Sequence, residues 1–120
     1  MHRSIGAFSH GVIDYAMVLI LAIGPGVAGF RGKQAALCYT LAAIHFVLTI
    51  LTRYPLGVLK HVGFPMHGAI ELLVGILMIL FPWISNFARG VLSRNFFVAV
   101  GALIILIWFL TDYRGLRRKT

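Results

Sequence analysis

Acidic residues are nearly missing from this chain, which contains three Asp and Glu residues among 120, against eleven Lys and Arg. Charged residues make up only 12% of the sequence, while 60% of it is hydrophobic, well above the roughly 45–50% that is usual in soluble domains. So few polar side chains do not cover a water-soluble globule. The composition therefore disfavours a soluble fold and indicates a protein that is surrounded by lipid.

Cysteine is equally scarce, because Cys38 is the only one and lies inside an apolar stretch. A single cysteine excludes an intramolecular disulfide. The sequence also lacks a phosphate-binding glycine loop, a zinc-finger spacing and a nucleophile paired with a base. We therefore expect neither an enzyme nor a bound cofactor.

The apolar residues fall into four long runs. Backbone polar groups cannot stay unpaired in hydrocarbon, so each run of about 20 apolar residues is expected to form a membrane-spanning helix. The expected helices extend from Gly6 to Val27, from Gln34 to Arg53, from Pro65 to Ile84 and from Val91 to Thr111.

Basic residues lie almost entirely between these runs, as they do in membrane proteins, so the net charge of +8 does not indicate nucleic-acid binding. Four helices place both termini and the central loop on one side, which then carries the larger number of basic residues. This count predicts cytoplasmic termini. The basic tail from Arg114 to Lys119 is expected to attract anionic lipid. The side with the termini and the central loop carries Arg3, Arg53, Lys60, Arg114, Arg117, Arg118 and Lys119. The opposite side carries Arg31, Lys33, Arg89 and Arg94.

An internal repeat is the clearest pattern in the sequence. The segment from His10 to Asp14 recurs 57 positions later as His67 to Glu71, and the end of the second helix, Leu51 to Tyr54, recurs 59 positions later as Leu110 to Tyr113. Each repeat holds two helices, so both copies enter the membrane from the same side. We therefore predict an all-α, four-helix membrane bundle of two parallel hairpins, related by a pseudo-two-fold axis along the membrane normal. It forms a single domain over 1–120, with repeats at about 6–57 and 63–116.

The chain resembles the SPW-repeat family of small bacterial membrane proteins. The resemblance lies in a glycine seven residues before a Pro-Trp pair, here Gly75 and Pro82-Trp83, and in the His-Gly-x-x-Asp/Glu starts of both repeats. Phe81 stands where the family name has serine, and the first copy has Pro25-Gly26 in place of Pro-Trp. The resemblance implies a four-helix domain in the bacterial inner membrane and no established activity.

The three acids of the chain all occupy repeat-motif positions at one predicted membrane face. His10 and Asp14 are four residues apart, as are His67 and Glu71, so each pair shares a helix face. Across the pseudo-axis these side chains are expected to converge, joined by residues at the ends of the second and fourth helices. The candidate site comprises His10, Asp14, His67, Glu71, Thr52, Arg53, Tyr54, Thr111, Asp112 and Tyr113.

This candidate site has three interpretations. In the first, the acids form a structural network of three local pairs, His10 with Asp14, His67 with Glu71, and Arg53 with Asp112, since an unpaired charge at low dielectric is costly. In the second, the two histidines and two carboxylates His10, Asp14, His67 and Glu71 bind zinc, manganese or iron. In the third, His10 and His67 are axial ligands of a b-type haem. His45, whose aligned position is Ile104, is expected to be a buried histidine outside the site.

The corresponding functional hypotheses belong to different classes. The first is a non-catalytic scaffold or accessory subunit that packs against itself or against other membrane-protein subunits. Its basis is the small size of the chain, which leaves little room for a water-filled pathway. The second is a small-ligand or metal-cation site at the cytoplasmic end of the membrane.

Overall fold

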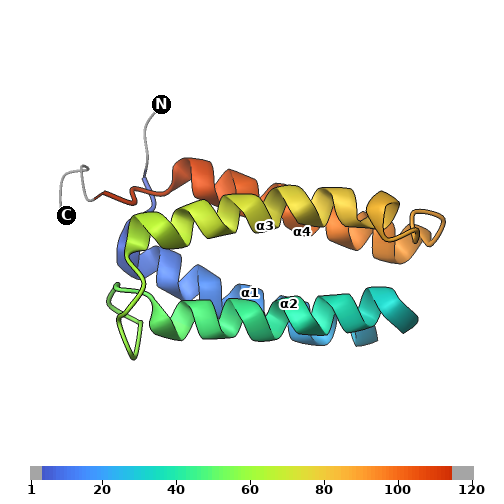
Figure 1. Ribbon diagram of the computed structural model, residues 1–120, viewed down its shortest axis with the longest axis horizontal. Coiled ribbons are helices and arrows are strands. Elements are labelled where there is room, and N and C mark those ends of the chain that lie inside the picture. Colours follow the sequence, from blue (N-terminus) through green and yellow to red (C-terminus); the bar gives the residue numbers. More distant parts are fainter. Residues whose placement is uncertain (1–3, 115–120) are drawn as a thin grey trace.

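The computed structural model of the chain describes residues 4–114, and these residues form four helices and no strand (Figure 1). The helices are α1 (Ala7–Ala28), α2 (Gly32–Leu51), α3 (Phe64–Ile84) and α4 (Val91–Leu110). All four are long and apolar enough to cross a membrane. The predicted four-helix membrane architecture is confirmed, and the predicted ends lie within about two residues of the observed ones.

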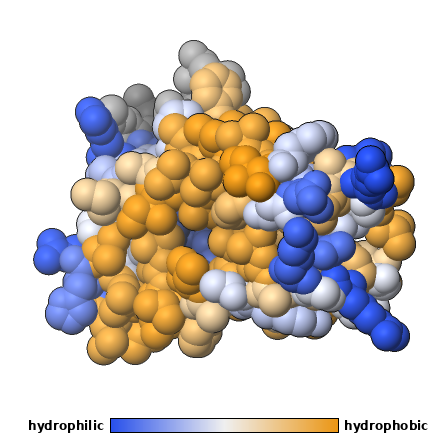
Figure 2. Space-filling model, turned by 45° about the vertical axis from the view of Figure 1, so that its right-hand side comes forward, coloured by the Kyte–Doolittle hydropathy of each residue, from blue (hydrophilic) through white to orange (hydrophobic). Residues whose placement is uncertain are grey.

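The helices pair as two hairpins, α1 with α2 and α3 with α4, and α1 also contacts α4 across the two pairs (Figure 1). Between 28% and 39% of each span is buried inside the bundle, so most of every helix faces outward. Hydrophobic side chains cover much of the visible face between hydrophilic ends (Figure 2). Such a surface is suited to contact with lipid tails.

The loops at one end of the bundle are closed by matching backbone bonds. Pro25 lies inside α1, and its carbonyl accepts bonds from Gly29 (2.9 Å) and Phe30 (3.0 Å), so the helix continues through the proline and ends in a left-handed glycine with φ 84°. In the other hairpin Phe87 donates in the same way to the carbonyl of Pro82 (2.7 Å). Phe30 and Phe87 are both buried, so this end has an aromatic core.

The opposite end is held by two short backbone bridges. Ile5, just before α1, donates to Leu110 (3.0 Å) and accepts from Asp112 (2.8 Å), so it lies beside the end of α4. Val62, just before α3, pairs in the same way with the end of α2, donating to Leu51 and accepting from Arg53 (both 2.7 Å). These bonds satisfy carbonyls that a helix end leaves open. They also place the end of each hairpin beside the start of the other.

Two glycines let α3 and α4 approach closely. A Cβ atom added to Gly101 would lie 2.7 Å from the carbonyl oxygen of Gly75, and one added to Gly75 would lie 3.2 Å from the carbonyl oxygen of Gly101. The two backbones therefore touch at this crossing, as small residues allow in membrane helices. Gly75 is one turn after Glu71, so this contact also fixes the position of a candidate site residue.

Candidate functional site

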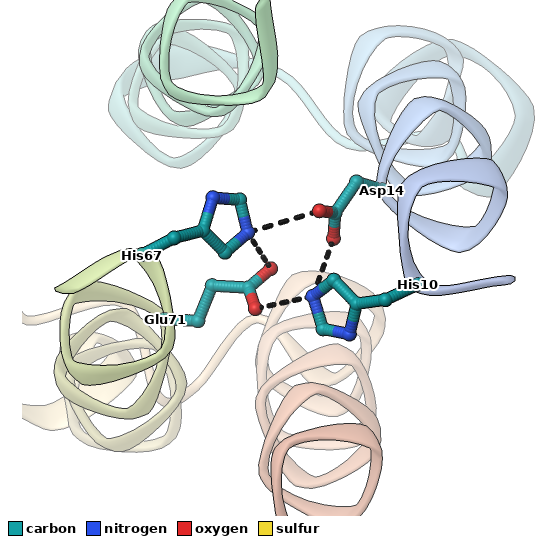
Figure 3. Close-up of side chains that lie close together, drawn as sticks. All are labelled: His10, Asp14, His67 and Glu71. Carbon is teal, nitrogen blue, oxygen red and sulfur yellow. Dashed lines mark hydrogen bonds and ion pairs between the residues drawn. The ribbon is translucent and has the colours of Figure 1, made fainter. Parts of the chain in front are cut away.

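Four side chains from two helices meet in the bundle interior, near the end where α1 and α3 begin (Figure 3). His10 and Asp14 come from the first turns of α1, and His67 and Glu71 from the first turns of α3. In each pair the spacing of four residues brings both side chains to one helix face. The predicted convergence is confirmed, because one ligand atom from each of the four residues lies within 4.8 Å of the others.

The four side chains form a closed ring of alternating imidazoles and carboxylates. Within each hairpin, Nε2 of His10 lies 3.2 Å from Oδ1 of Asp14, and Nε2 of His67 lies 3.2 Å from Oε2 of Glu71. Between hairpins, the distances are shorter: 2.7 Å from His10 Nε2 to Glu71 Oε1 and 2.9 Å from His67 Nε2 to Asp14 Oδ2. All four residues are at least 94% buried by side chain. The local pairs expected from sequence thus form, and they combine into one cluster.

Two threonines orient the histidines from behind. Thr52, at the end of α2, lies 2.6 Å from Nδ1 of His67, and Thr111, at the end of α4, lies 2.9 Å from Nδ1 of His10. Each threonine hydroxyl also donates to the helix carbonyl four residues earlier, at 2.6 Å in both cases. A hydroxyl has one proton to donate, so toward each histidine it accepts a bond from Nδ1–H.

This arrangement fixes the chemistry of the other ring nitrogen. In a neutral imidazole whose Nδ1 carries the proton, Nε2 presents a lone pair. Both Nε2 atoms point at the carboxylates (Figure 3). Lone pairs on the two nitrogens repel the two carboxylates, so the ring needs either added protons between the nitrogens and oxygens or a cation among the four groups.

Two tyrosines close the site at the end of the bundle where α1 and α3 begin. Tyr54 donates a 2.8 Å bond to Oδ2 of Asp14, and Tyr113 donates a 3.1 Å bond to Oε1 of Glu71. Burial, and next the nearby carboxylate, raise the pKa of Tyr54 and Tyr113 well above the ordinary value of 10. Both hydroxyls therefore stay protonated and act as donors. Thr52, Thr111, Tyr54 and Tyr113, which the sequence pattern places in the candidate site, thus all contact the cluster.

A fifth residue, His45, also reaches the cluster, although its lack of a histidine counterpart in the repeat predicts a position outside it. Its Nε2 lies 3.6 Å from Oδ1 of Asp14 and 3.8 Å from Oε2 of Glu71, and the residue is 94% buried. The signal that would have found it is helical spacing. His45, Thr49 and Thr52 recur at intervals of four and three along α2, so they share one face, and Thr52 was already a candidate.

The expected pair between Arg53 and Asp112 is not formed. Arg53 is exposed and its Nε donates instead to the carbonyl of Lys60, 3.0 Å away. Asp112 is buried beside Ile5 and lines a cavity of about 440 Å³ on the outer side of α3 and α4, together with Arg114 and Trp108. Arg53 and Asp112 lie on different hairpins. Each side chain is directed by the backbone of its own loop, so their equivalence in the repeat does not bring them into contact. Most of the basic tail, from residue 115 onward, lies outside the described residues.

The cluster leaves no space for a porphyrin, and a small cavity lies beside its two carboxylates. The Asp14 and Glu71 carboxylates occupy the region between His10 and His67, where a haem ring would have to lie (Figure 3). The cavity beside the two carboxylates measures about 10 Å³, close to the volume that one water molecule needs. It is lined otherwise by apolar side chains of Ile13, Met17, Ile104 and Ile107. The geometry therefore favours a monatomic ligand over haem.

No known protein family, curated protein sequence or solved structure matches this chain.

Proposed function

We propose that this chain is a multi-pass protein of the bacterial inner membrane, with both termini in the cytoplasm, that binds one divalent transition-metal cation between its two hairpins. His10 and His67 supply imidazole nitrogens, and Asp14 and Glu71 supply carboxylate oxygens. The role is non-catalytic. Bound metal joins the two hairpins, and the outward apolar faces pack against lipid, against further copies or against other membrane subunits.

The observation that carries this proposal is the state of the buried histidine nitrogens. Nε2 of His67 lies within 3.2 Å of both carboxylates, yet it has no hydrogen-bond partner among the described residues. The equivalent nitrogen of the first hairpin, Nε2 of His10, does have a hydrogen-bond partner, Oε1 of Glu71 at 2.7 Å, so the unpartnered position is that of His67. Without a bound ion, leaving such an atom without a partner in a buried site costs about 1–3 kcal/mol.

The spacing of the ligand atoms also supports a metal. An ion with four ligands at about 2.0–2.2 Å in a tetrahedron separates neighbouring ligands by roughly 3.3–3.6 Å. The four nitrogen–oxygen distances around the ring are 2.7, 2.9, 3.2 and 3.2 Å. These contacts use both oxygens of each carboxylate. With one ligand atom taken from each of the four residues, the atoms lie within 4.8 Å of one another, so the four groups are close enough to share one ion after side-chain rotation.

The charge of the two carboxylates favours a divalent cation over a monovalent one. Two ionised carboxylates and two neutral imidazoles leave two negative charges in a low-dielectric interior, where a net charge is expensive. A divalent cation neutralises them. Imidazole and carboxylate ligands suit zinc, iron, manganese and their neighbours in the first transition row. Thr52 and Thr111 also support a metal site, because metal-binding histidines almost always donate their second N–H to a fixed acceptor, and these hydroxyls accept from Nδ1–H of His67 and His10.

The pairing of the hairpins fits the proposed internal repeat. Thr52–His67 corresponds to Thr111–His10 under the sequence alignment, and the Tyr54 and Tyr113 bonds correspond in the same way. A pseudo-two-fold axis through the ring accounts for these matches. The proposed SPW-repeat relationship and this symmetry together describe one hairpin duplicated around a shared site.

The direct test is metal content. Protein purified in mild detergent without chelators is expected to contain about one first-row metal ion per chain by elemental analysis. X-ray absorption at that metal's edge is expected to show nitrogen and oxygen neighbours at roughly 2.0–2.2 Å. Protein that contains no metal as purified, and that takes none up from Zn²⁺, Mn²⁺, Fe²⁺ or Co²⁺ solutions, would leave the ring as an imidazolium–carboxylate network of a scaffold.

The two threonines offer a prediction about orientation. Thr52→Val or Thr111→Val removes the acceptor of one Nδ1–H bond at nearly constant volume. Metal affinity is expected to fall by roughly 10–100-fold, the usual effect of losing such a support. The measurement is competition with a coloured chelator. Thr40→Val is the matched control, because Thr40 makes the same bond to a helix carbonyl but is exposed and remote from the ring. An equal loss of affinity in all three variants would contradict the role given to Thr52 and Thr111.

A further inference from the structure

We infer that His45 is a fifth ligand of the proposed cation, so that the site is five-coordinate, with three imidazole nitrogens and two carboxylate oxygens. This inference rests on the proposed cation site and specifies which ions it prefers. The internal repeat does not predict a role for His45, because the aligned position in the second hairpin is Ile104.

The position of the His45 ring supports direct ligation. Its Nε2 is one of two buried side-chain nitrogens that have no hydrogen-bond partner among the described residues, the other being Nε2 of His67. Nε2 of His45 faces one oxygen of each carboxylate, at 3.6 Å from Asp14 and 3.8 Å from Glu71. These separations are too long for hydrogen bonds. They are close to the separation of two atoms that share one metal ion.

His45 approaches from a direction that the other four ligands leave open. It comes from α2, whereas His10 and Asp14 come from α1, and His67 and Glu71 from α3. Its ring lies 6.4 Å from the His67 ring, centroid to centroid, compared with 5.4 Å between the rings of His10 and His67. Three helices thus supply ligands, and the fourth, α4, contributes Thr111 and Tyr113 from the residues that follow it.

An additional imidazole changes which ions the site favours. Zinc bound entirely by protein ligands is almost always four-coordinate and tetrahedral. Among first-row ions that take similar ligands, selectivity comes from geometry and ligand number more than from intrinsic affinity. A five-coordinate shell therefore favours Fe²⁺, Mn²⁺ or Co²⁺ relative to the preference that a four-ligand site would show. His45 becomes the residue that determines specificity.

Cobalt provides the test, because the intensity of its visible absorption bands distinguishes tetrahedral from five-coordinate ions. Wild-type protein loaded with Co²⁺ is expected to show the weaker bands of five-coordination. His45→Leu is expected to show the more intense tetrahedral bands and to raise the affinity ratio of Zn²⁺ over Co²⁺ by about tenfold or more. His61→Leu, which replaces an exposed histidine outside the ring, is the matched control and is expected to match the wild type.

The outcomes separate this inference from the proposed function. If wild-type protein and His45→Leu bind Co²⁺ with the same spectrum and the same Zn²⁺ preference, His45 is not a ligand, while the four-residue site stands. If the wild type binds neither metal, both proposals fail. Circular dichroism of each metal-free variant checks that the helices are intact, and His45→Gln, which retains a polar side chain, gives a second variant if His45→Leu does not fold.

Discussion

Replacing Glu71 by Gln is expected to lower metal affinity by more than 100-fold while the four helices remain folded. The substitution keeps the size of the side chain and removes one of two carboxylates, so the remaining charge no longer balances a divalent ion. Loss of a supporting residue alone costs roughly 10–100-fold, and loss of a ligand is expected to exceed that. Asp14→Asn should have a similar effect, because Asp14 occupies the equivalent corner of the ring.

The stability of the metal-free protein distinguishes this result from a structural role. If the ring is an ion-pair network of protonated histidines, Glu71→Gln breaks a buried pair and destabilises the protein by about 3–5 kcal/mol. If the ring is a metal site, the metal-free variant is at least as stable as the wild type, since one of two neighbouring negative charges is gone. Chelator competition and thermal melting in detergent measure the two quantities. Asp112→Asn is the control, because Asp112 is the remaining acid and lies outside the ring.

Gly101→Leu is expected to disrupt the second hairpin. Its Cβ atom would lie 2.7 Å from the carbonyl oxygen of Gly75 and 3.1 Å from the backbone nitrogen of Ile79, and backbone atoms cannot rotate away. Extra methylene groups in a packed interior cost about 1–3 kcal/mol, and more where the backbone must move. We therefore expect a loss of at least 3 kcal/mol, with a smaller loss in Gly101→Ala.

The matched control for this prediction is Gly26→Leu. Gly26 is also a glycine within a membrane helix, but a Cβ atom there would meet nothing within 4 Å. Thermal melting in detergent is expected to show little change for Gly26→Leu and a lower midpoint for both Gly101 variants. Equal melting of Gly101→Leu and the wild type would show that α3 and α4 do not need this contact.

The helices were predictable because the bilayer imposes a length and a composition on every span. The runs from Gly6 to Val27 and from Val91 to Thr111 contain few signals other than apolarity, and this was sufficient. The convergence of His10 with Glu71 was also predictable, since two similar hairpins that enter from the same side bring their first turns together. The similarity between the two repeats was therefore enough to predict that residues far apart in the sequence lie close together.

The errors arose where the two hairpins differ. The alignment of His45 with Ile104 predicts a position outside the site, yet a site shared by two hairpins does not require equal contributions from each. Arg53 was paired with Asp112 because they align, but aligned residues on separate loops follow different backbones, and Arg53 is drawn to the carbonyl of Lys60. Alignment indicates equivalence of position and does not establish contact.

The shortest nitrogen–oxygen contacts in the ring both run between the hairpins, and this has a thermodynamic consequence. His10 is held by Thr111 and Glu71 of the second hairpin, and His67 by Thr52 and Asp14 of the first. A cation that binds only the joined form stabilises it by about 2.7 kcal/mol at a free concentration one hundred times its dissociation constant. Linkage is reciprocal, so any neighbour in the membrane that separates the hairpins at this end must lower their affinity for the cation. The arrangement of the helices would then depend on the free metal concentration, and the amount of bound metal would depend on the arrangement of the helices.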